Sequence, residues 1–384
     1  MKANSCRCTT ILAIGSFLCL MAVTGCEKVP TFQELTGQQP GQPSQTTPNA
    51  TPAATPQASQ PTSTPEVTKP VPIDSAKFLA DFAARRPEAI TDADLKTLAA
   101  LDSGREQVTS MDVTRSGISD DGLLNLTKLS ELSVLNLSST GIDGHGLEAL
   151  ARCPNLKRLK VSGALRMSPQ GWETLSKVSQ LEFLDVSSTG NISDADVSKF
   201  TALTSLRELN LSETPVTDEV FKTLAEMENL EILRIEKDGL IKGHGLQAYT
   251  RSKPVLREIY ASGTPLGNAG LRHIKSISSL AFLDISASNL TDQQFAELKG
   301  ANNLVHLKVG ANFLSNAGMQ TVLGLSKLKI LELEGMQTIS DPGLGILSKK
   351  SGLQTLNVKK TPFTPKAIEQ FRKIHKNCEV LASE

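Results

Sequence analysis

From residue 108 onward, apolar residues recur at fixed offsets with a period of 24 to 26 residues, eleven times over. In the second copy the six apolar positions, at offsets 0, 3, 5, 10, 15 and 18, are Leu132, Leu135, Leu137, Ile142, Leu147 and Leu150. The copies begin at Val108, Leu132, Leu156, Leu181, Leu206, Leu230, Leu256, Leu280, Leu304, Leu328 and Leu353. Self-similarity at this period is typical of a solenoid, in which each unit packs only against its neighbours.

The spacing within one copy indicates its local structure. Offsets 3 and 5 alternate, which predicts a short strand, and offsets 15 and 18 are three apart, which predicts one face of a helix. A Ser-Asp or Thr-Asp pair often precedes the helix, as at Ser119, and Thr291 with Gln294 forms a capping box. Prolines that suit the first helical positions are Pro169, Pro342 and Pro365. One unit cannot bury its own apolar face, so the sequence predicts an α/β solenoid with a parallel sheet on one side and helices on the other.

Offset 8 carries a short polar residue in eight of the eleven copies. These residues are Ser116, Thr140, Thr189, Thr214, Thr264, Ser288, Asn312 and Thr361. A buried turn leaves backbone groups that need hydrogen-bond partners. We therefore expect these side chains to bond to the turn of the neighbouring repeat and to form a ladder along the solenoid.

The pattern Leu-x-x-Leu-x-Leu-x-x-Thr-x-Ile-x-Asp-x-Gly-Leu-x-x-Leu resembles leucine-rich repeats, most closely the cysteine-containing, ribonuclease-inhibitor-like class. The junction at residues 150–156, Leu-Ala-Arg-Cys-Pro-Asn-Leu, is similar to that class, although Thr often replaces its Cys or Asn. The resemblance covers residues 108–376. It implies a right-handed horseshoe with the parallel sheet on the concave side and the helices on the convex side.

The N-terminus has the pattern of an export signal. Lys2 and Arg7 are followed by an apolar run over residues 11–23. Those 13 residues are too few for a membrane span, which takes about 20 residues, but they suit the core of a signal peptide. We therefore assign residues 1–25 to a signal peptide.

The run ends in Val-Thr-Gly-Cys, and Cys26 is its last residue. This motif resembles the lipobox of bacterial lipoproteins, which implies cleavage before Cys26 and lipidation of its thiol. In that family, Asp after the cysteine tends to retain a protein at the inner membrane. The resemblance, with Glu27 at this position, therefore implies a lipid-anchored protein of the cell envelope, at the outer membrane rather than the inner one. An ordinary secretory signal with a chance cysteine is the alternative.

Three further segments surround the repeats. Residues 26–72, which begin with the lipidated cysteine, are rich in Pro, Thr and Gln, and this composition predicts a disordered tether. Residues 73–107 read as a helical N-terminal cap, and residues 377–384 as a C-terminal cap. Caps are expected because the end units of a solenoid would otherwise expose their apolar faces.

The sequence holds little that suggests chemistry. Phosphate loops, nucleophile elbows and paired-cysteine metal motifs are absent from it. His145 and His244 occur in equivalent Gly-His-Gly turns and read as exposed turn residues. Cys153 and Cys378 lie nine repeats apart, too far for a disulfide, and are expected to be reduced and at least half buried. We therefore predict no enzyme activity, no cofactor and no metal.

Strand residues at offsets 2 and 4 point away from the core and form the candidate binding face. The candidate partner-binding residues are Arg158, Lys160, Phe183, Asp185, Ile232, Arg234, Tyr260, Phe282, Asp284 and Lys308. Phe183, Ile232, Tyr260 and Phe282 are expected to face solvent, and central aromatic and arginine side chains are typical of protein interfaces. The alternative is that the offset-2 residues pack against neighbouring strands.

The balance of charged residues bears on which class of partner the chain can bind. Lys and Arg total 40 and Asp and Glu total 40, which argues against a nucleic-acid binder. A basic group that could meet an anionic polymer, or simply be solvated, is Arg152, Lys157, Arg158, Lys160 and Arg166. The favoured function is a monomeric, membrane-anchored module that binds a protein or peptide on its concave face. An envelope enzyme or glycan-associated factor, and a purely structural surface protein, are the alternatives.

Overall fold

The computed structural model describes residues 73–250 and 255–382. The repeats belong to the unit Pro70–Glu384. The signal peptide of residues 1–25, the lipidation site Cys26 and the tether of residues 26–72 lie outside the described residues, as do the last two residues of the expected C-terminal cap. These assignments stay predictions.

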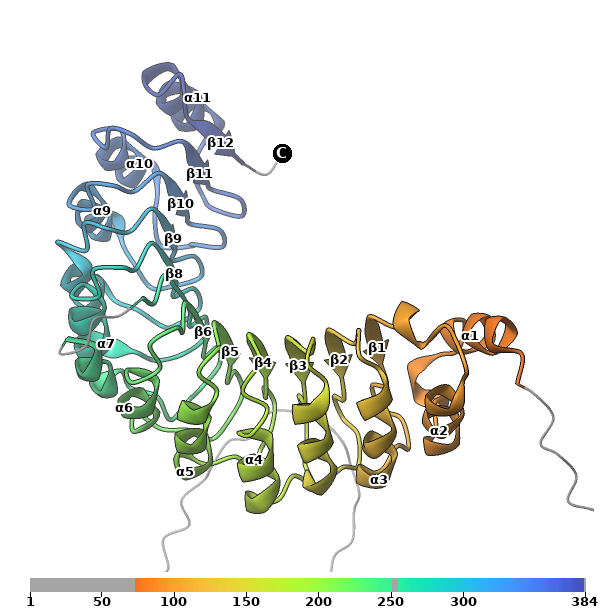
Figure 1. Cartoon of the computed structure of the whole chain (residues 1–384). Helices are drawn as coiled ribbons and strands as arrows, with labels where there is room; N and C mark the ends of the chain where they lie inside the picture. The colour runs from red at the N-terminus through yellow and green to blue at the C-terminus, as the bar shows by residue number, and fades with distance from the viewer. Residues whose placement is uncertain (1–72, 251–254, 383–384) are drawn as a thin grey trace, which may run out of the picture. The chain divides into compact units, whose positions relative to one another are not determined.

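The described residues form one open sheet of twelve parallel strands in chain order. The strands are β1 (Ser110–Asp112), β2 (Val134–Asn136), β3 (Arg158–Lys160), β4 (Phe183–Asp185), β5 (Glu208–Asn210), β6 (Ile232–Arg234), β7 (Glu258–Tyr260), β8 (Phe282–Asp284), β9 (His306–Lys308), β10 (Ile330–Glu332), β11 (Thr355–Asn357) and β12 (Glu379–Leu381). Each strand pairs with the next at equal offsets, so that Leu135 lies opposite Leu159. The strands line the inner side of a curved row and the helices its outer side (Figure 1). The predicted α/β solenoid is therefore confirmed.

The helical segments are short, and many are 3-10 helices. The α-helices are α1 (Ser75–Ala83), α2 (Asp92–Ala100), α3 (Asp120–Leu123), α4 (Pro169–Leu175), α5 (Asp194–Ser198), α6 (Val220–Leu224), α7 (Gly267–Ile274), α8 (Asp292–Phe295), α9 (Met319–Leu323), α10 (Asp341–Leu347) and α11 (Pro365–Ile374). The 3-10 helices are η2 (Pro87–Ala89), η3 (Arg105–Gln107), η4 (Leu124–Lys128), η5 (His145–Arg152), η6 (Lys199–Ala202), η7 (His244–Thr250), η8 (Ala296–Leu298) and η9 (Asn316–Gly318). Within the described part of the chain, no helix is long and apolar enough to cross a membrane.

The apolar positions of the repeat form one continuous core. Leu135, Leu137, Leu147 and Leu150 are at most 1% exposed, and the equivalent strand positions are buried in the other repeats. The capping predictions also hold, because Ser119 accepts a bond from the helix N–H of Gly122 and the Thr291 capping box is present. Packing between neighbouring units thus follows directly from the sequence period.

The turn after each strand has a fixed backbone shape. The residue at offset 7 has a positive φ in all eleven repeats, as Ala287 does at 53° and Gly263 at 74°. Three repeats place glycine there and eight place another residue, which a left-handed conformation disfavours. The turn is therefore imposed by stacking in most repeats.

The predicted offset-8 ladder is present only in part. Thr264 Oγ1 and Asn312 Nδ2 donate to the offset-5 carbonyl of the preceding repeat, at 2.5 and 2.9 Å, as predicted. Thr140, Thr214 and Thr361 instead donate to the offset-5 carbonyl of their own repeat, at 2.5 to 2.7 Å. A threonine hydroxyl satisfies one carbonyl at a time, so the bonds cross between repeats only in places.

A second set of bonds, which we call the helix-start ladder, links several helix starts to the next repeat. The Asp120 carboxylate accepts bonds from the backbone N–H groups of Asp143, Gly144 and Gly146, at 2.8 to 3.0 Å. Equivalent bonds to the following repeat are accepted by Asp92, Asp194, Asp218, Asp292, Asn316 and Asp341. The sequence indicated that these residues serve their own helix, whereas their side chains reach the neighbouring one.

Candidate functional site

The concave face carries a continuous line of contacting side chains from β3 to β10. Arg158 places its guanidinium 3.8 Å from the ring centroid of Phe183. The Glu208 carboxylate then lies 3.8 Å from Arg158 and 3.0 Å from Arg234. We call this line the concave row, and its members are Arg158, Phe183, Glu208, Arg234, Tyr260, Phe282, His306 and Glu332.

The aromatic part of the concave row follows. Arg234 lies 3.9 Å from the Tyr260 ring centroid, and the Tyr260 and Phe282 centroids are 4.5 Å apart. The Phe282 ring meets His306 edge to face at 4.8 Å, and His306 Nε2 lies 2.7 Å from Glu332 Oε1. These spacings match the distance of about 4.8 Å between neighbouring strands, so side chains at similar offsets stack along the sheet. The row is held in place before any partner arrives.

The charge states of the row follow from these contacts. Partial burial opposes the charged form of Arg234, but the hydrogen bond and the charge of Glu208, with smaller contributions from Tyr260 and Glu236, outweigh burial and raise the pKa of the guanidinium. Burial and the Glu258 carboxylate, which accepts a bond from the phenol at 2.8 Å, raise the pKa of Tyr260. The centre of the row is therefore a charged guanidinium on a neutral phenol.

Of the four large side chains expected to face solvent, one is buried and three are half buried. Phe183 is only 6% exposed, so its assignment as solvent-facing is wrong. The Arg158 guanidinium lies over the ring, as packing between neighbouring strands would give. Ile232, Tyr260 and Phe282 are half buried, so Tyr260 and Phe282 present only part of their rings.

Asp185 and Asp284, which the sequence placed in the binding face, help to shape the turns. Each accepts a hydrogen bond at 3.0 Å from the N–H two residues later, and Asp284 is 9% exposed. The same bond occurs at offset 4 for Asp112, Asn136, Asn210 and Asn357. An Asp or Asn that recurs at offset 4 was the sequence signal for this turn.

The predicted basic group does not form one patch. Arg158 and Lys160 are exposed on β3, and Lys157 pairs with Glu182 at 3.2 Å. Arg152 ends η5 in the helical row, so it lies on a different side of the repeat from the strand residues. Lys308, at the other end of the candidate face, lies 3.5 Å from Glu332. The structure thus gives no support to a concentrated polyanion site.

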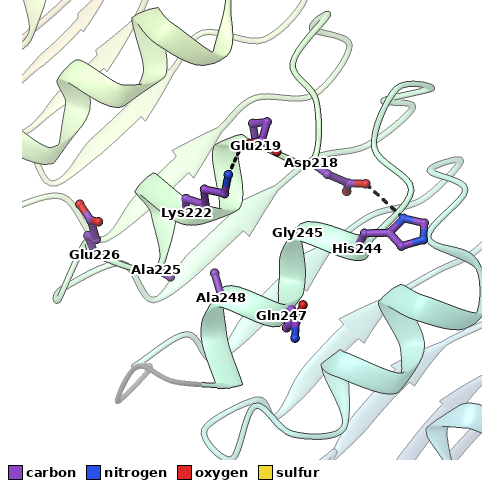
Figure 2. Close-up of a pocket in the computed structure, with 9 residues that line it drawn as sticks. All are labelled: Asp218, Glu219, Lys222, Ala225, Glu226, His244, Gly245, Gln247 and Ala248. Carbon is purple, nitrogen blue, oxygen red and sulfur yellow. Dashed lines mark hydrogen bonds and ion pairs between the residues drawn. The ribbon is translucent and has the colours of Figure 1, made fainter.

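The convex side has a groove of about 640 Å³ between α6 and η7. Figure 2 shows its lining side chains in separate pairs. Lys222 meets Glu219, and Asp218 lies 3.5 Å from the His244 ring, while Glu226 stands apart. Asp218 is also held by the N–H groups of Lys242 and Gly243, as part of the helix-start ladder. The groove therefore does not bring an acid, a base and a nucleophile together.

The cysteines and histidines also fit structural roles. Cys153 and Cys378 are free and buried, as predicted, and burial raises the pKa of Cys153 to about 11, which disfavours a reactive thiolate. His145 and His244 are exposed, as predicted, and are the first residues of η5 and η7. The bond to Asp143 raises the pKa of His145. Among the described residues, no group of three His, Cys, Asp or Glu side chains could hold a metal ion.

Comparison with known proteins agrees with this architecture. Residues 129–151 match a family model described as a leucine-rich repeat. Solved structures match as well, and one is the crystal structure of an internalin from Listeria monocytogenes. It is 20% identical, with a TM-score of 0.53 over 76% of each chain, so the likeness shows the fold alone. The chain thus contains a match to the leucine-rich-repeat model and has the fold of a repeat solenoid.

The comparisons support the fold and no particular activity. No curated protein sequence is similar enough to count as a match. Neither the family model nor the solved structure names an enzyme family.

Proposed function

We propose that this leucine-rich-repeat protein is a non-catalytic binding module, anchored by lipid on Cys26 in the bacterial cell envelope, that holds a protein or peptide on its concave face. The observation that carries the proposal is the concave row. The core-facing strand residues, at offsets 3 and 5, are apolar in every repeat, whereas the residues of the concave row differ from strand to strand. Such variation is expected of a surface that binds one particular partner. Aromatic and arginine side chains are also those that contribute most to protein interfaces.

The arrangement of the row supports recognition without chemistry. Its charged members are paired with one another, which fixes side-chain positions and reduces the entropy lost on binding. A partner would meet the half-buried rings of Tyr260 and Phe282 at the centre and the exposed cations of β3 at one end. This pattern of an apolar centre with a polar rim is common in specific interfaces.

The binding proposal is tested with Tyr260→Ala combined with Phe282→Ala. The full chain and the variant are used to capture partners from envelope extracts, and captured proteins are compared by mass spectrometry. The proposal expects the variant to lose a specific partner at least tenfold. The matched control is Phe313→Ala, because Phe313 is an aromatic residue that is 64% exposed outside the strands. Equal capture by both variants would show that the concave row is not the binding surface.

The anchoring proposal has its own matched pair of variants. Cys26→Ser is expected to abolish incorporation of radiolabelled fatty acid and to release the protein from the membrane fraction. Cys19→Ser, a change to another cysteine of the same N-terminal region, is expected to leave both unchanged. Labelling that survives Cys26→Ser would contradict lipidation at this residue.

A further inference from the structure

The turn after β6 contains a carboxylic acid in the place where other repeats carry a hydroxyl or an amide. Asp238 occupies offset 8 of the sixth repeat and is 0% exposed. A carboxylate at such a site loses its hydration, which is costly unless charges or several hydrogen bonds replace it. The contacts of Asp238 therefore decide which protonation state the fold accepts.

Asn312, at the same offset of the ninth repeat, shows what this site requires. Asp238 Oδ1 accepts the N–H of Thr214 at 2.9 Å, and Asn312 Oδ1 accepts the equivalent N–H of Ser288 at 3.0 Å. The Asn312 Nδ2 group donates to two offset-5 carbonyls, one in its own repeat and one in the preceding repeat, both at 2.9 Å. The offset-8 position thus favours a side chain with one acceptor atom and one donor atom.

An ionised Asp238 has no donor to offer. Its Oδ2 is buried without a hydrogen-bond partner. The two offset-5 carbonyls of this turn belong to Leu211 and Ile235, and both face the turn closely enough to accept threonine hydroxyls. A protonated Oδ2–H adds a donor to the turn, as the Asn312 amide does, whereas a carboxylate leaves a buried negative charge with no hydrogen bond to Oδ2.

The surrounding charges act in the same direction. Burial, with smaller contributions from the carboxylates of Glu213 and Glu236, raises the pKa of Asp238 to about 7 against the lowering effect of the backbone N–H groups of Thr214 and Glu213. The nearby cation, Lys237, pairs with Glu213 at 2.7 Å. The turn of the seventh repeat contributes the neutral hydroxyl of Thr264, which accepts the Asp238 N–H at 3.0 Å.

We propose that Asp238 is a proton-dependent joint between the fifth and sixth repeats, protonated in the folded protein and loosened when the proton is lost. Since each repeat is held by its neighbours alone, one weakened step lowers the stability of the array at its middle. The joint directly follows β6, which supplies Arg234 to the concave row. Loss of the proton would thus lower the local stability at the centre of the concave face.

The direction of the pH effect follows from linkage. The pKa of Asp238 is higher in the folded chain than the ordinary value of 3.8 that the unfolded chain has. The stabilisation is therefore fully present below pH 4 and is lost as the pH rises through about 7. Between pH 5 and pH 8 the equilibrium constant for unfolding should rise about 10- to 100-fold through this group alone.

The test compares the full chain with Asp238→Asn by chemical denaturation from pH 5 to pH 8. The asparagine supplies both the acceptor and the donor at every pH, so the variant should lack this component and be more stable than the wild type at pH 8. The reciprocal change, Asn312→Asp, should create a second loss of stability over the same pH range. Equal pH profiles for the wild type and Asp238→Asn would overturn the proposal.

Hydrogen exchange on the unmodified protein keeps the test independent of how the variants fold. The Thr214 N–H is bonded to Asp238 and the Ser288 N–H to Asn312, so the two amides form an internal pair. After correction for intrinsic rates, protection at Thr214 should fall at least tenfold relative to Ser288 between pH 5 and pH 8. A constant ratio would contradict the proposal.

Discussion

Along the helix-start ladder, an Asp or Asn makes the same kind of bond at several junctions between repeats, whereas along the concave row the side chains differ from strand to strand. Asp120 and Asp292 make equivalent bonds to the following repeat although they lie seven repeats apart. Along the concave row, by contrast, Phe183 is followed by Glu208 and then by Arg234. The ladder repeats because every junction between units has the same backbone groups to satisfy.

The difference separates what holds the solenoid together from what is free to specialise. A residue of the ladder serves the junction, so its loss should lower stability wherever it occurs. A residue of the row contacts its neighbours through side chains alone, so it can vary without breaking the stack. The following four changes test this division.

The largest effect is expected at the close approach beneath the helix-start ladder. A Cβ on Gly146 would lie 2.1 Å from the backbone oxygen of Asp120, so Gly146→Ala forces two repeats apart. We expect a loss of about 3 kcal/mol in the free energy of unfolding, measured by urea denaturation. Gly117→Ala is the control, because nothing lies within 4 Å of its Cβ. A similar loss in both variants would mean that glycine flexibility, and not the close approach, matters here.

The ladder carboxylate itself comes next. Asp120→Ala leaves three backbone N–H groups without their acceptor and should cost about 2 kcal/mol. Asp121→Ala removes an exposed neighbouring carboxylate and should cost less than about 1 kcal/mol. Urea denaturation of both variants measures the difference. If the two losses were equal, the ladder would contribute nothing beyond the helix dipole.

Asp185 lies where the two regions meet, since it is on the concave face but serves a turn. Asp185→Ala removes the bond to the Ser187 N–H and should cost about 1 kcal/mol. Asp185→Asn keeps that acceptor, as Asn210 does at the same offset, and should keep stability and partner capture. Loss of the partner in a stable Asp185→Asn variant would return this carboxylate to the binding surface.

The smallest effect is expected at the left-handed turn position. Ala287→Gly relieves a positive φ of 53°, which disfavours alanine by about 1–2 kcal/mol, but glycine loses about 0.5–1 kcal/mol more on ordering. The net result should be a gain below about 1 kcal/mol in thermal or urea unfolding. Ala296→Gly, at a right-handed position that opens η8, should instead destabilise. A loss at both positions would show that the turn carries no strain.

Part of the candidate site followed from the sequence. Offset counting placed Arg234, Tyr260 and Phe282 side by side on one face, because strands stacked at equal offsets bring such residues together. It could not show that Phe183 is covered or that Asp284 is turned into its own strand end. The burial of Phe183 depends on the rotamer of Arg158, and the orientation of Asp284 depends on a local hydrogen bond to a backbone N–H. Neither can be read from the repeat period of the sequence.

What the sequence determined by itself is the architecture: eleven copies of six apolar positions bury one another only when the units stack, so the strands, the helices and their order follow. What the tertiary structure alone decided is how polar groups are shared between units. Asp120 reaches forward to the next repeat and Asp238 is enclosed by the preceding one, since each depends on backbone groups about 24 residues away. Burial of apolar side chains needs only apolar residues at the right spacing, which the sequence shows. A hydrogen bond needs one donor and one acceptor at a particular distance and angle, which only the packed structure shows.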